Sequence, residues 1–205
     1  MARYLGRVQL PRLILASASP RRVELLRQLG LDFEIIPARV EEIEDAHLSP
    51  FELCQLNAHR KARAVAKKIP DALVLAADTL VFLETEIFSK PRDVAEAERM
   101  LARLQGRVHQ VVTGVSLIHL RRYRERLFAV NTEVKFRPLT AEQIRDYLAK
   151  VNPLDKAGGY AIQEHGERIV AGISGSLSNV IGLPVEQLKV ELAAWGSGEA
   201  AGLSD

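Results

Sequence analysis

The chain has 205 residues, of which 47% are hydrophobic and 26% are charged, a balance typical of one globular domain or of two small lobes sharing a core. Its 28 Lys and Arg against 26 Asp and Glu leave a net charge of +2, which excludes a protein that holds DNA mainly by neutralising phosphates. The single cysteine excludes an internal disulfide, and no apolar run is long enough to span a bilayer. Residues 1–10 lack the apolar core of a secretory signal, so we expect a cytoplasmic protein without a membrane partner.

Short apolar runs alternate with helical patterns along the first half of the chain. The helical patterns begin at residues that cap helices, such as Ser49, which is followed three residues later by Glu52. In chain order, the patterns predict a strand over residues 13–16, a helix over 20–30, a strand over 33–36, a helix from 50 to about 68, a strand over 72–77, a hairpin over 81–88 and a helix over 94–104.

The second half of the chain begins with β-branched and alternating residues. They predict a long hairpin over residues 108–135 with a charged turn at 121–125, then a helix over 141–150, a short strand around 169–170 and a last helix from 184 to 195. Strands and helices mostly alternate, so we expect an α/β fold with a mixed, largely central sheet flanked by helices and extended by the hairpin. Residues 13–195 would form this domain, either as one body or as two lobes with a cleft between them, with an extension over 1–12 and a flexible tail over 196–205.

Two hydroxyls and two guanidiniums follow the first predicted strand. Ser17, Ser19, Arg21 and Arg22 lie at the start of a helix, where backbone N–H groups, the helix dipole and arginine side chains all favour phosphate oxygens. The alternative is a capped helix that carries surface arginines. The segment is neither a Walker loop nor a glycine-rich dinucleotide turn.

Three further charged residues follow apolar or capping patterns. Asp78 ends the apolar run 72–77 and should lie at the carboxyl end of a buried strand, where open α/β sheets bind ligands, although an Asp that only caps a turn fits the same pattern. Lys61 lies at the border of the inner face of its helix, where a lysine either serves a site or extends its ammonium to water. Lys90 precedes Pro91 on an extended segment, and alone it would be an ordinary surface lysine.

Two polar segments complete the candidates. Glu42, in an acidic loop, offers oxygen ligands for Mg²⁺ or is part of a solvated loop. Asp155 and Lys156 precede two glycines that allow close approach of backbone to a ligand, or simply form a turn. Gln163 carries both a donor and an acceptor, which suits reading the edge of a nucleobase as well as a buried structural role.

The order of these motifs resembles that of the Maf family of nucleoside triphosphate pyrophosphatases. The likeness spans about residues 13–188 and rests on nine segments in order. They are Ser17-Ala-Ser-Pro-Arg-Arg22, the Glu41-Glu42 loop, Lys61-Ala62, Ala77-Asp78-Thr79, Lys90-Pro91, Thr113-Gly114, Asp155-Lys-Ala-Gly158, Ile162-Gln163 and Ile181-Gly-Leu-Pro184.

This resemblance implies a Maf and inosine triphosphatase-like fold and a metal-dependent reaction. Members of the family hydrolyse a nucleoside triphosphate between its α and β phosphates, which yields the monophosphate and pyrophosphate. Arg22, Thr79 and Gln163 match the positions that distinguish the dTTP/UTP branch, and Asp78 matches the proton acceptor. The resemblance also implies a homodimer, for which the 108–135 hairpin is the expected surface.

Charge chemistry and the resemblance together assign roles to the candidate residues. We expect the basic side chains to neutralise the triphosphate, while Glu42 and Asp78 hold Mg²⁺ or Mn²⁺ and direct the attacking water. The catalytic set is then Asp78, Lys90, Lys61 and Glu42. The substrate-binding set is Ser17, Ser19, Arg21, Arg22, Thr79, Asp155, Lys156 and Gln163.

Two other functions fit the same sequence. One is a pyrophosphatase for 7-methyl-GTP or another modified nucleotide. The other is a nucleotide-binding regulator of septum formation without catalysis, although such a binder has no need of acidic groups that repel a triphosphate.

Overall fold

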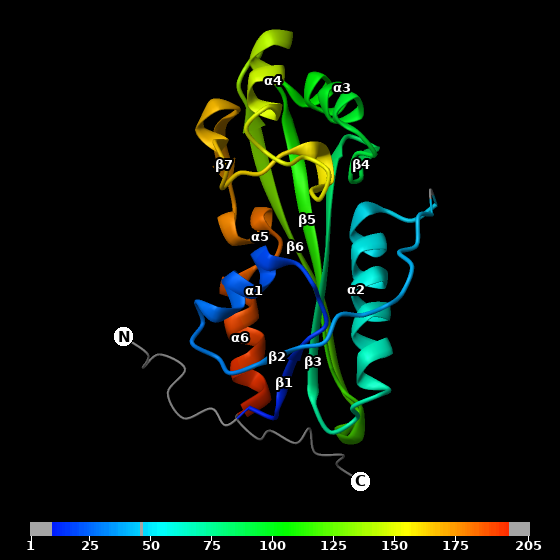
Figure 1. Ribbon diagram of the computed structural model, residues 1–205. Coiled ribbons are helices and arrows are strands. Elements are labelled where there is room, and N and C mark those ends of the chain that lie inside the picture. Colours follow the sequence, from blue (N-terminus) through cyan, green and yellow to red (C-terminus); the bar gives the residue numbers. More distant parts are fainter. Residues whose placement is uncertain (1–9, 46, 197–205) are drawn as a thin grey trace.

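The computed structural model describes residues 10–45 and 47–196, and within them the chain forms one seven-stranded sheet flanked by helices (Figure 1). The strands are β1 (Leu13–Leu15), β2 (Glu34–Ile35), β3 (Leu73–Leu83), β4 (Glu86–Phe88), β5 (Val108–His119), β6 (Arg124–Phe136) and β7 (Val170–Ser174). Their order is β2-β1-β3-β5-β6-β7, and β4 pairs with β3. Strand β1 is parallel to both of its partners, β2 and β3, and all the other strand pairs are antiparallel. The predicted mixed α/β sheet is therefore confirmed.

The helices begin where the capping patterns predict. They are α1 (Pro20–Arg27), α2 (Pro50–Ala66), α3 (Val94–Leu104), α4 (Ala141–Leu148), α5 (Leu177–Ile181) and α6 (Val185–Gly196), with short 3-10 turns at Leu120–Arg122, Ala157–Gly159 and Gly166–Arg168. Ser49 with Glu52 and Thr140 with Gln143 each form both hydrogen bonds of a capping box. Only α5 was not predicted, because a five-residue helix is too short to show a helical period.

The prediction that a strand ends at Asp78 is wrong. β3 runs on through Asp78 to Leu83, because β5 pairs with it without a break from Val74 to Phe82. Asp78 therefore lies in the middle of a strand rather than at its carboxyl end. The predicted hairpin follows, with Val81 paired to Phe88 across β3 and β4.

Both faces of β3 are buried, and its residues alternate between them. Leu73, Leu75 and Ala77 belong to the core that α1 and α6 cover, whereas Val74 and Ala76 belong to the core under α2. Figure 1 shows α2 on one side of the long strands and α1 and α6 on the other, with α3 and α4 covering the far end of the sheet. Because side chains alternate along a strand, Asp78 continues the α2 face and Thr79 continues the face of α1.

One edge of β3 is open where these two residues lie. β1 pairs with β3 only as far as Leu75, and β4 begins its pairing at Val81. In the described part of the chain, no strand pairs with this edge between those residues. After β1 the chain instead turns through Ser17 into α1, which brings the start of that helix to the gap.

The flanking segments differ in how much of them is described. The predicted extension over residues 1–12 is described from residue 10, where Leu10 packs against the core that α1 and α6 cover. Of the predicted tail, only Gly196 is described, as the last residue of α6. None of the helices in residues 10–45 and 47–196 is long and apolar enough to cross a membrane.

The close packing of α2 on β5 depends on Gly114. A Cβ at this position would lie 2.5 Å from the carbonyl carbon of Cys54, whose side chain is buried in the core as the sequence indicated. We expect Gly114→Ala to lower the free energy of unfolding by about 1–3 kcal/mol or more, because the backbone of α2 must move away. Denaturant unfolding would measure the loss. Gly172→Ala on β7, where a Cβ meets nothing within 4 Å, is the matched control, and equal stability of the two variants would contradict the prediction.

Candidate active site

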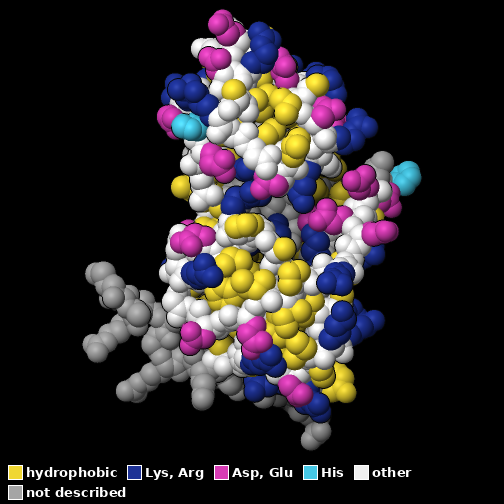
Figure 2. Space-filling model, viewed as in Figure 1, with side chains coloured by type: hydrophobic (Ala, Val, Ile, Leu, Met, Phe, Trp, Pro, Cys, Tyr) yellow, Lys and Arg dark blue, Asp and Glu magenta, His cyan; other side chains and the backbone are white. Residues whose placement is uncertain are grey.

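A cavity of about 600 Å³ lies at the open edge of β3. Its walls come from the start of α1, the acidic loop before α2, the middle of β3, the segment before α3, the loop over residues 155–163 and the end of α5. Figure 2 shows basic and acidic side chains gathered around the hollow at mid-height of the molecule. Of the predicted site residues, all twelve line this cavity: Ser17, Ser19, Arg21, Arg22, Glu42, Lys61, Asp78, Thr79, Lys90, Asp155, Lys156 and Gln163.

The ammonium of Lys61 joins the two predicted metal ligands. Its Nζ lies 2.6 Å from Oδ1 of Asp78 and 2.6 Å from Oε1 of Glu42. The two carboxylate oxygens are therefore no farther apart than twice that distance, although the residues come from a strand and a loop. The Lys61 and Asp78 side chains are only 13% and 7% exposed, so this ion pair is shielded from solvent.

The loop that carries Glu42 is held against α2 by one buried amide. Asn57 accepts a hydrogen bond from the Ile43 N–H at 2.8 Å and donates one to the Ile43 carbonyl at 3.1 Å. Asn57 lies one helical turn before Lys61, so the same face of α2 positions the loop backbone and the ammonium. This clamp was not among the predicted site residues, because a helix residue and a loop backbone show no local signal of their contact.

Burial and Lys61 act in opposite directions on the two carboxylates. Burial raises the pKa of Asp78 above its ordinary value, and the charge and hydrogen bond of Lys61 oppose this only in part. Burial also disfavours the ionised form of Glu42, but here Lys61, together with the charges of Lys90 and Arg22, outweighs it and the pKa is lowered. Two neighbouring acids with pKa values shifted apart are typical of functional sites.

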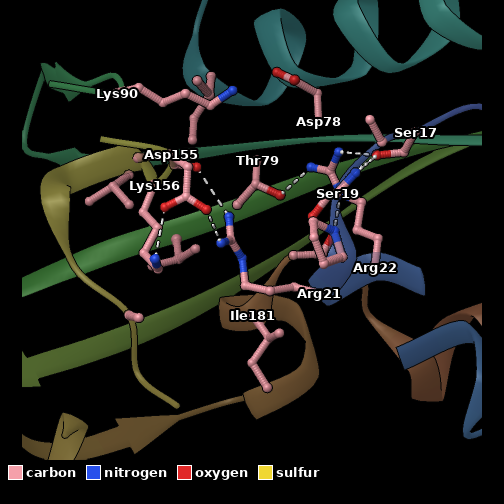
Figure 3. A pocket seen from close by; sticks show the side chains of 18 of the residues that line it. Ser17, Ser19, Arg21, Arg22, Asp78, Thr79, Lys90, Asp155, Lys156 and Ile181 are labelled. Carbon is pink, nitrogen blue, oxygen red and sulfur yellow. Dashed lines mark hydrogen bonds and ion pairs between the residues drawn. The ribbon is translucent and has the colours of Figure 1, made fainter. Parts of the chain in front are cut away.

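Arg22 reaches across the gap from α1 to the other face of β3. Its Nε donates to the Gly182 carbonyl at 2.8 Å, and its terminal nitrogens donate to Oγ1 of Thr79 at 3.0 Å and Oγ of Ser17 at 3.4 Å. Burial lowers the pKa of this guanidinium, while the charges of Asp78 and Glu42 favour its ionised form. Figure 3 shows Arg22 beside Thr79 and Ser17, with Asp78 on the side of α2.

Arg21 and the 155–163 loop close one side of the cavity. Arg21 donates to Oδ2 of Asp155 at 2.7 Å and to the Asp155 carbonyl at 3.2 Å (Figure 3). Lys156 is buried, and its ammonium donates to Oδ1 of Asp155 and to the Asn152 carbonyl, both at 2.7 Å. Asp155 therefore connects both basic side chains, and Lys156 serves mainly to order its own loop.

The remaining predicted residues face the cavity with free polar groups. Ser19 is the N-cap of α1, but its side chain makes no capping hydrogen bond, so the hydroxyl is available to a ligand. Lys90 is exposed, and its charge contributes to the lowered pKa of Glu42. Gln163 is exposed at the rim on the opposite loop. Figure 3 shows Lys90 on the same side of the cavity as Asp78.

The acidic pair fits a cation that is completed by its substrate. No group of three or more His, Cys, Asp or Glu suited to a metal occurs in the portion of the chain that the structure describes. Mg²⁺, however, is commonly bound through one or two carboxylates together with phosphate oxygens and water. Asp78 and Glu42 supply that number of carboxylates from one wall of the cavity.

Comparison with known proteins shows which family the chain resembles. A model of the family described as Maf-like protein matches residues 12–195. A dTTP/UTP pyrophosphatase of Moorella thermoacetica is 50% identical over 185 residues, which cover 90% of this chain and 95% of that protein. One of Akkermansia muciniphila is 49% identical over 179 residues, or 87% of this chain and 94% of that protein.

A solved structure shares the fold at much lower identity. The structure of a HAM1 protein from Coxiella burnetii has a TM-score of 0.50 with 14% sequence identity, covering 90% of this chain and 100% of that one. At this identity the likeness concerns the fold alone. The family match over most of the sequence, together with relatives that are about half identical, is decisive: the chain belongs to the Maf-like protein family.

Proposed function

We propose that the protein hydrolyses dTTP, UTP and related pyrimidine nucleoside triphosphates between the α and β phosphates, releasing the monophosphate and pyrophosphate. The observation that carries this proposal is the convergence of Asp78, Glu42 and Lys61 on one wall of a cavity whose opposite wall is the basic start of α1. The names of the relatives from Moorella thermoacetica and Akkermansia muciniphila support the reaction and the pyrimidine substrates.

Cleavage of a phosphoanhydride requires compensation of the phosphate charge, in-line alignment of the reacting groups and a nucleophilic water. It requires little covalent chemistry by the protein. The start of α1 offers backbone N–H groups, the Ser19 hydroxyl and the Arg21 guanidinium to phosphate oxygens. Lys90 adds a positive charge on the side of Asp78. A triphosphate entering here competes with Asp155 for Arg21, so binding would loosen the contact between α1 and the 155–163 loop.

In this proposal, Asp78 orients the attacking water and accepts its proton. An ordinary Asp has a pKa of about 3.9, far below that of bulk water at about 15.7, and burial raises the pKa of Asp78. A divalent cation held by Asp78 and Glu42 would supply the remaining polarisation of water and phosphates. Lys61 favours the ionised form of both carboxylates and holds them close together.

We expect Asp78→Asn to lose at least about 10²-fold in kcat while nucleotide binding persists, because the variant keeps the shape and loses the proton acceptor. Pyrophosphate release from dTTP and UTP, with binding followed by calorimetry, would measure both effects. Asp71→Asn, an exposed carboxylate paired with Arg121, is the control and should turn over normally. Near-normal turnover of Asp78→Asn would remove this residue from the mechanism.

Metal dependence gives a second prediction. Dialysis against EDTA should abolish pyrophosphate release, and added Mg²⁺ or Mn²⁺ should restore it, because the two carboxylates repel a triphosphate unless a divalent cation lies between them. The measurement is turnover before chelation, in chelator and after each metal is returned. Undiminished turnover in chelator would contradict the role given to Asp78 and Glu42 as metal ligands.

The contact between Lys61 and Asp78 predicts how the activity depends on pH. Lys61 holds the pKa of Asp78 lower than burial alone would set it, so Lys61→Met should raise that pKa further. Because the proton acceptor must be ionised, the acidic limb of the kcat/KM profile should move to higher pH. Lys67→Met, an exposed lysine of the C-cap of α2, is the control. An acidic limb that stays in place in Lys61→Met would show that this ion pair does not control the active ionisation.

A further inference from the structure

A row of three oxygen atoms leads from α5 to the cavity through the interior of the protein. The carbonyl oxygen of Asn179 lies 3.1 Å from Oγ1 of Thr113, which lies 3.0 Å from Oγ1 of Thr79. The row ends at Arg22, which donates to the Thr79 oxygen at 3.0 Å. Thr79 and Thr113 are directly opposite one another on β3 and β5, and Thr113 is fully buried.

The carbonyl at the far end decides which way these hydroxyls point. A carbonyl oxygen only accepts hydrogen bonds, so the hydrogen between Asn179 and Thr113 comes from Thr113. The hydrogen between the two threonines must then come from Thr79. Any other arrangement leaves the Thr113 oxygen about 3 Å from a second oxygen with no hydrogen between them, which is costly because Thr113 is fully buried.

The Asn179 carbonyl is itself held in place. The side-chain amide of Asn179 donates to the Val111 carbonyl at 2.9 Å and to Oγ1 of Thr132 at 3.0 Å, which anchors α5 on β5 and β6. The end of the same helix provides the Gly182 carbonyl that accepts from Nε of Arg22. Carbonyls at the end of one short helix therefore orient both the threonine pair and the guanidinium.

The protein therefore presents a hydrogen-bond acceptor, the Thr79 oxygen, beside a donor, the Arg22 guanidinium, to the cavity. The Thr79 hydrogen is used inside the protein, so its oxygen can offer only a lone pair to a ligand. Arg22 uses three of its five N–H groups on Ser17, Thr79 and Gly182, and among the described residues the others meet no hydrogen-bond acceptor. Phosphate oxygens only accept, so the ligand group that meets the Thr79 oxygen must carry an N–H or O–H.

This pattern matches one kind of pyrimidine and opposes the other. Uracil and thymine present a carbonyl oxygen next to the N3–H, which is an acceptor beside a donor. Cytosine presents an amino group next to an unprotonated N3, which is the reverse. A Thr79 hydroxyl that only accepts hydrogen bonds therefore favours uracil and thymine, whose N3–H can donate to it. With cytosine, the Thr79 oxygen would face the unprotonated N3, which is also an acceptor.

We propose that Thr113 is a positioning residue that, with the Asn179 carbonyl, fixes the hydrogen of the Thr79 hydroxyl and so makes the site select uracil and thymine over cytosine. The inference rests on the proposed function, since it assumes a pyrimidine nucleotide in this cavity. Thr113 acts only through Thr79 and does not touch the ligand.

The test is the affinity of Thr113→Val for UMP and CMP, measured by calorimetry. Valine keeps the volume and removes the hydroxyl, which frees the Thr79 hydrogen to turn toward the ligand. The ratio of the CMP to the UMP dissociation constant should fall about tenfold, the scale of one neutral hydrogen bond. Ser116→Ala removes a buried hydroxyl of β5 that has no hydrogen-bond partner among the described residues, and it should leave the ratio unchanged.

A double-mutant cycle separates positioning from a general structural effect. If Thr113 acts through Thr79, adding Thr113→Val to Thr79→Val should cause no further change in the ratio, whereas independent effects would add. Should Thr113→Val fail to fold, Thr113→Ser and Thr113→Ala isolate the hydroxyl. The serine variant should keep the preference and the alanine variant should lose it.

The outcomes that overturn the inference are distinct from failure of the proposed function. An unchanged ratio in Thr113→Val, an equal loss of both affinities, additive effects in the cycle, or a wild-type protein without preference for UMP would each refute the role of Thr113. Absence of pyrophosphate release from dTTP and UTP by the wild-type protein would refute the proposed reaction, while the binding comparison would still decide the inference.

Discussion

The interruption of strand pairing along β3 is the constraint on which the site depends. A strand buried on both faces normally sends successive side chains into separate cores, and β3 does so over its first residues. Between the end of β1 and the start of β4 the edge of the strand is open, so neighbours that point to opposite faces reach one cavity. Asp78 and Thr79 are these neighbours, and each meets a different set of partners.

The two faces of this gap carry different chemistry. On the side of α2, the Lys61 ammonium joins the buried Asp78 carboxylate to the more exposed Glu42 carboxylate and favours the ionised form of both. An ion pair of this kind contributes little net stability, because desolvation of the charges offsets their attraction; in the function proposed above, it would prepare the carboxylates for a cation or a water. On the side of α1 and α5, neutral hydroxyls and carbonyls orient Arg22, so that face suits recognition of polar groups by direction rather than by charge.

Much of the fold and the membership of the site could be predicted from the sequence. The capping boxes at Ser49 and Thr140 mark helices correctly, since a cap depends on residues three positions apart. The alternating residues over 108–135 indicate the β5–β6 hairpin for a similarly local reason. The twelve predicted site residues do line one cavity. The continuation of β3 through Asp78 was missed, because it depends on the partner strand β5.

By itself, the sequence determined the element types, the order of the motifs and the kinds of side chain available for a polyphosphate. The tertiary structure alone decided which side chains meet. Arg22 and Gly182 are 160 positions apart, and Thr113 and Asn179 are 66 apart. Contacts at such separations follow from strand register and helix placement, to which the whole core contributes, whereas patterns read along the chain report only neighbours within a few residues. For that reason the direction of the Thr79 hydroxyl, and the selectivity inferred from it, became visible only in the folded molecule.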